Sequence, residues 1–100
     1  MNSIRLNRDN IFRDMFIPCD MRGNEIAMAI VPQNEHKIYV LRLLEDGDQY
    51  LDVRSWTKYG KEKDFGPSKQ GFHIKMSIFK DKMKGYLDEM CSLDVKTLNK

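Results

Sequence analysis

The chain has 100 residues, of which 41% are hydrophobic and 32% charged, and its formal net charge is +2. This length suits one domain, and this composition is typical of a globular protein rather than a disordered one. No apolar stretch approaches the roughly 20 residues that a membrane-spanning helix needs, so we expect no membrane partner.

The residues that could report a compartment or a cofactor are few. Cys19 and Cys91 lack CxxC spacing, and residues 2–14 are polar and alternately charged, unlike a signal peptide. We therefore expect a reducing, intracellular location, either a bacterial or viral cytoplasm or a nucleus. His36 and His73 are isolated in the sequence, so we expect no metal and no cofactor.

The positive charge is concentrated in one part of the chain. Residues 54–84 contain nine basic and three acidic residues, a net charge of +6, and the rest of the chain is net acidic. This asymmetry favours a polyanionic partner, although a solvated lysine-rich surface would give the same pattern.

We expect residues 1–35 to form an N-terminal arm that could add a strand or hairpin. A short helix is expected over 9–15, where Asp9 or Asn10 could cap it. The apolar run at 26–31 is interpreted as a buried strand that ends at Pro32.

Residues 36–91 carry the clearest pattern. Strands are expected over 37–44 and 49–56, joined by an Asp46-Gly47 hairpin turn. A basic turn at 66–71 should precede a strand over 72–76, and Ser77 should cap a helix. Residues 92–100 are a polar tail. The predicted fold is α+β: a small curved antiparallel sheet of about four strands and a C-terminal amphipathic helix.

The helix has an apolar stripe and one glycine. The stripe, which is assigned to the core or a dimer interface, consists of Phe79, Met83, Tyr86, Leu87 and Met90. Gly85 is expected to mark close packing, because glycine in a helix costs about 1 kcal/mol relative to alanine.

The strand at 49–56 suggests a function. Its alternation places Arg54 and Trp56 on the face away from the core, next to the basic loop. There the tryptophan could stack on bases while Arg54, Lys58, Lys69 and Lys75 bind phosphates, as in proteins that bind single strands.

Structural explanations stand beside these functional ones. Trp56 could pack across strands, and Arg54 could pair with Asp52. Gly71 could serve only turn geometry. Asp46, Asp48 and Asp52 could suggest a nuclease, but Asp-Gly hairpin chemistry explains the first two, and we expect no enzyme.

The order LDVRSW, charged turn, PSKQG, short strand and helix resembles the family of the transcriptional positive cofactor four, a coactivator, and especially its bacterial and phage relatives. The resemblance implies a four-stranded sheet and a helix that dimerise, and single-stranded DNA bound along the sheet. Arg54, Trp56, Lys69 and Gly71 match motif or DNA-contacting positions of the family.

Two departures from the family weaken part of this channel. The family's turn before the signature strand is usually basic or aromatic, whereas this chain has the acidic residues Glu45, Asp46 and Asp48. Gln70 replaces a second cation beside Gly71. An acidic turn would repel phosphate.

The sequence therefore predicts a homodimeric protein that binds single-stranded DNA largely without sequence preference, in transcription regulation or in DNA replication and repair. RNA is a variant of the same ligand. The alternative is a module that binds a transcription or replication protein, with weak or no nucleic-acid binding.

Overall fold

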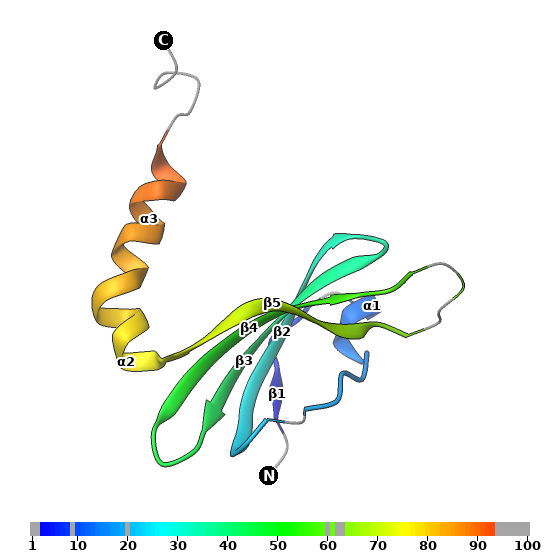
Figure 1. Ribbon diagram of the computed structural model, residues 1–100, viewed down its shortest axis with the longest axis horizontal. Coiled ribbons are helices and arrows are strands. Elements are labelled where there is room, and N and C mark those ends of the chain that lie inside the picture. Colours follow the sequence, from blue (N-terminus) through cyan, green and yellow to red (C-terminus); the bar gives the residue numbers. More distant parts are fainter. Residues whose placement is uncertain (1–2, 9, 20, 60, 62–63, 94–100) are drawn as a thin grey trace.

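The computed structural model describes residues 3–8, 10–19, 21–59, 61 and 64–93 of the chain. Its centre is a five-stranded sheet with the strand order β1-β2-β3-β4-β5 (Figure 1). The strands are β1 (Ile4–Arg5), β2 (Asn24–Asn34), β3 (Lys37–Glu45), β4 (Gln49–Thr57) and β5 (Gly66–Lys75). β2 to β5 pair antiparallel, and the short β1 pairs parallel to β2. The predicted α+β class is confirmed, with one strand more than expected.

The hairpin of β3 and β4 forms where the sequence predicts it. The register runs without interruption from Lys37 opposite Thr57 to Glu45 opposite Gln49. Gly47 has a φ of 75°, which only glycine adopts easily, and the Asp46 amide donates to the Asp48 carbonyl at 2.9 Å. Turn chemistry thus accounts for the Asp-Gly pair.

β2 confirms the strand predicted over 26–31 but passes through Pro32. Its pairing with β3 continues to Pro32 opposite Ile38 and Asn34 opposite Lys37. The prediction that Pro32 ends the strand is wrong. β1 pairs with β2 only at Ala27 and Met28, so β1 does not require a hydrogen bond from residue 32. A proline is tolerated at a strand edge that donates no ladder hydrogen bond.

The basic turn predicted at 66–71 is instead the first half of β5. A register shift opposite the Arg54–Trp56 step lets this irregular segment join the ladder. Gly71 has a φ of 157°, and a Cβ placed there would lie 2.9 Å from the Arg54 Cα and closer still to the Val53 carbonyl oxygen. Gly71 is thus required by the close approach of β5 to β4.

The described residues also contain four helical segments: α1 (Asn10–Arg13), α2 (Met76–Ile78), the π-helical η1 (Phe79–Met83) and α3 (Lys84–Ser92). α1 confirms the predicted short helix, whereas Asp9 lies outside the described residues. The prediction that Ser77 caps the long helix is wrong, since helical structure begins at Met76 with no side-chain cap.

The three C-terminal segments bury no residue of their own. They project from the end of β5 and do not lie over the sheet, as Figure 1 shows. Likewise, a Cβ at Gly85 would have no atom within 4 Å, so within one chain the expected close packing at this glycine is absent from the described residues.

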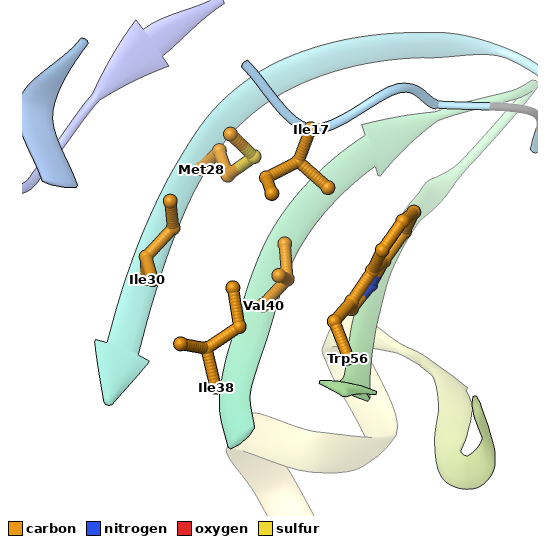
Figure 2. Close-up of a cluster of buried hydrophobic side chains, with 6 residues drawn as sticks. All are labelled: Ile17, Met28, Ile30, Ile38, Val40 and Trp56. Carbon is orange, nitrogen blue, oxygen red and sulfur yellow. The ribbon is translucent and has the colours of Figure 1, made fainter. Parts of the chain in front are cut away.

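The core lies on one face of the sheet, beneath the N-terminal arm. We call it the arm face; it carries Ile38, Val40, Arg42 and Leu44, each at most 2% exposed. Figure 2 shows the apolar cluster that the arm closes: Ile17, Met28, Ile30, Ile38, Val40 and Trp56. The arm and the sheet thus form one folded unit.

Polar contacts hold the arm in place. The buried Arg42 guanidinium donates to the carbonyls of Ile17 and Pro18 at 2.8 and 3.0 Å and pairs with Glu25 at 2.5 Å. The Asn7 side chain both accepts from and donates to the backbone of Ile30. Since carbonyl groups and a carboxylate surround the guanidinium, its charge is compensated despite its burial.

Candidate nucleic-acid interface

Trp56 lies inside the protein. Its side chain is part of the core, 4% exposed, and the Arg42 guanidinium lies 5.9 Å from its ring centre. The prediction that this face of β4 points away from the core is wrong, because the arm covers it at Ile17 and leaves the opposite face open. Trp56 therefore offers no surface for base stacking in this structure.

The arm does not cover the whole of β4 and β5. Alternate residues at the open part of the arm face form what we call the β4–β5 strip: Tyr50, Asp52, Arg54, His73 and Lys75. Tyr50 is opposite Lys75, Asp52 is opposite His73, and Arg54 is opposite Gly71, so these side chains leave the same side of the sheet. The strip brings two of the predicted site residues, Arg54 and Lys75, onto one surface.

The centre of the strip is an electrostatic cluster. Asp52 is fully buried, and its Oδ1 accepts from the Arg54 Nη2 at 3.4 Å and lies 3.1 Å from the His73 Nδ1. The Arg54 side chain is still 35% exposed. The salt bridge considered for Arg54 therefore exists, and it holds a cation at the surface where a phosphate can reach it.

An aromatic pair lies beside this cluster. The Tyr50 and His73 rings stack with their centres 5.1 Å apart and an angle of 19° between their planes. Both rings border a hollow of about 320 Å³ that Arg22 and Asp46 also line. His73 is exposed and Tyr50 is partly exposed, so this pair has the accessible ring surface that was expected of Trp56.

Two further predicted lysines lie outside the β4–β5 strip, one within β5 and one directly after β4. Lys69 is exposed within the irregular part of β5, two residues before Gly71. Lys58 follows β4, and its Nζ lies 4.9 Å from the centre of the Phe65 ring at a pocket of about 490 Å³ between the arm and the β4–β5 connection. From Tyr50 to Lys58 the chain spans about 26 Å at ~3.3 Å per residue.

Acidic side chains limit the strip at one end. The β3–β4 turn exposes Glu45, Asp46 and Asp48, and Asp48 lies 3.8 Å from the Lys75 ammonium group. This exposed pair is weak and screened by salt. The turn that departs from the family pattern thus lies directly beside the Tyr50 end of the strip.

The opposite face of the sheet is largely apolar, and no described helix or arm segment covers it. We call it the open face; it carries Ala27, Ala29, Leu41, Leu43, Leu51, Val53, Phe72 and Ile74. Phe72 is 43% exposed, and an apolar groove of about 240 Å³ runs over this face to Met76.

The helical stripe is also exposed. Tyr86, Leu87 and Met90 are 66%, 41% and 63% exposed, while Phe79 and Met83 are half-buried. The core assignment considered for these residues is wrong within one chain, and their place in a dimer interface stays a prediction.

Sequence reasoning did not select Tyr50 or His73 as site residues. Both were visible as alternating strand positions, but their pairing depends on the register between β4 and β5. The register in turn depends on the unforeseen strand over residues 66–71.

Comparison with protein-family models, curated proteins and solved structures finds no match for this chain. Within the described ranges, no three His, Cys, Asp or Glu side chains group as metal ligands, and no helix is long and apolar enough to cross a membrane.

Proposed function

We propose that this chain is a homodimeric single-stranded DNA-binding protein that acts, largely without sequence preference, in transcription regulation or in DNA replication and repair. The observation that carries the proposal is the set of solvent-accessible cations on and next to β4 and β5, two exposed and two partly exposed, beside a stacked ring pair. In chain order the cations are Arg54, Lys58, Lys69 and Lys75.

We assign phosphate binding and base stacking to different side chains according to their positions. Phosphates bind the cations, and Arg54 is the best positioned because Asp52 holds its guanidinium. Bases stack on the partly exposed Tyr50 ring instead of the buried Trp56, a contact worth about 1–3 kcal/mol per base in such proteins. RNA would meet the same groups, since none of them is assigned to a 2′-hydroxyl.

The surface area of the chain supports a second copy as a partner. A monomer of 11.8 kDa is expected to expose about 5,900 Å². This chain exposes 8023 Å². The excess of about 2,100 Å² is of the order that each partner loses in a large obligate dimer. The open face and the helical stripe supply matching apolar surfaces for such an interface.

The binding assay is fluorescence anisotropy with a labelled single strand of roughly 20 nucleotides, which exceeds the about 4–16 nucleotides that one OB-fold covers in other single-strand-binding proteins. The matching duplex and several salt concentrations serve as comparisons. Four neutralised phosphates predict a log–log salt slope of about −3 for the single strand. Equal affinity for the duplex, or no binding at low salt, would overturn the proposal.

Failure of this assay would favour the alternative, a module that binds a transcription or replication protein. The open face and the acidic β3–β4 turn would then be the first surfaces to test for a protein partner. Sedimentation equilibrium of the free protein decides the dimer separately from DNA binding.

A further inference from the structure

One member of the β4–β5 strip, Asp52, is a fully buried carboxylate. Asp52 is 0% exposed, and its Oδ2 has no hydrogen-bond partner among the described residues. A buried carboxylate is costly unless cations or donors surround it. Its contacts are the half-exposed side chains of Arg54 and His73, so both of these partners reach from the core to the surface.

The His73 ring is fixed on two sides. Its Nδ1 lies 3.1 Å from Asp52, and one ring face stacks on Tyr50. Since a carboxylate only accepts, Nδ1 carries the proton in this contact. The opposite nitrogen, Nε2, has no hydrogen-bond partner in the described part of the chain, and the side chain is 46% exposed. An imidazole held in this way presents Nε2 to solvent in one orientation.

We propose that His73 is a phosphate-binding residue for single-stranded nucleic acid. The protonated imidazole donates its Nε2–H to a backbone phosphate oxygen while Asp52 accepts from Nδ1–H. The neutral ring would present a lone pair at Nε2 and could not donate there. Binding therefore takes up at most one proton per site from solvent. This inference rests on the proposed function and adds a proton-linked contact to it.

Other charged and titratable groups surround the ring. From β4, β5 and the adjoining hollow these are Arg22, Asp46, Tyr50, Asp52, Arg54 and Lys75. Histidine is the side chain whose charge ordinarily changes near neutral pH. His36 is the only other histidine and lies in the β2–β3 connection beside Glu35, so it serves as the matched control.

The test compares the full-length wild type, His73→Gln and His36→Gln in binding a labelled oligothymidylate at about pH 6 and pH 8. Wild type and His36→Gln should bind about three- to tenfold more tightly at the lower pH. His73→Gln should lose this pH dependence and bind at about the wild-type affinity of the higher pH. Glutamine retains a donor for Asp52, and thermal unfolding followed by circular dichroism checks that the fold is kept.

Proton NMR of the unlabelled wild type gives a second readout that needs no variant. The two histidines give two Cε1–H signals, and only the His73 signal should shift on addition of DNA. Unchanged affinity and pH dependence in His73→Gln, with DNA still bound, would overturn this inference and leave the proposed function standing. Absence of binding by wild type at both pH values would overturn both.

Discussion

Replacing Trp56 by alanine distinguishes a core residue from a base-stacking residue. Full burial of a tryptophan removes up to ~250 Å² from water, which at about 25 cal/mol/Å² corresponds to ~6 kcal/mol. This is an upper bound, since the unfolded chain already buries part of its apolar surface. Truncation of buried aromatic residues typically costs about 3–5 kcal/mol, so we expect Trp56→Ala to lose about 4 kcal/mol.

Urea unfolding followed by far-UV circular dichroism measures this loss, because the variant lacks the only tryptophan of the chain. Tyr59, which is 68% exposed, provides the matched control, and Tyr59→Ala should change stability by less than about 0.5 kcal/mol. The wild-type indole should also resist aqueous quenchers. Two results together would refute the buried position: a folded Trp56→Ala protein whose unfolding free energy falls by less than about 1 kcal/mol, and the loss of its affinity for DNA.

Further predictions follow from contacts elsewhere in the fold. Gly71→Ala should destabilise by more than about 2 kcal/mol because its Cβ meets β4 backbone, whereas Gly85→Ala should stabilise by about 0.5–1 kcal/mol, and chemical denaturation measures both. Arg42→Ala should cost about 3–5 kcal/mol in the same assay, since it leaves a carboxylate and two carbonyls without their donor. On the open face, Phe72→Glu should weaken self-association at least tenfold in sedimentation equilibrium, and Tyr59→Glu should not; equal association of both variants would place the dimer elsewhere.

Local signals in the sequence were sufficient for the central hairpin and for the strand before it. The β3–β4 hairpin follows from alternating apolar residues and an Asp-Gly turn, which act between neighbours in the chain. The short helix at Asn10–Arg13 and the strand within Asn24–Asn34 were predicted for the same reason. The basic segment opening with Gly66 was misassigned because its strand pairing tolerates a register shift that has no simple sequence signal.

The direction of Trp56 depends on a long-range contact that periodicity does not encode. Both faces of β4 carry large apolar residues, Trp56 on one and Leu51 and Val53 on the other, so alternation alone leaves the buried face undecided. Packing of Ile17 from the arm decides it. Consequently Arg54 and Lys75 lie on an accessible surface, as predicted, whereas Trp56, the residue expected to stack on bases, is buried.

We expect affinity for the single strand to depend on where the cations lie on β4 and β5, and not only on the net charge of the protein. Two charge-matched variants test it: Lys69→Gln/Lys75→Gln on β5 and Lys80→Gln/Lys82→Gln on the helix, all four being exposed lysines. Measured by anisotropy at one low salt concentration, the β5 variant should lose at least tenfold in affinity and about 1.4 from the magnitude of the log–log salt slope. The helix variant should lose less than about threefold. Equal losses in both variants would mean that net charge alone attracts the DNA, and a larger loss in the helix variant would contradict the β4–β5 strip as the binding surface.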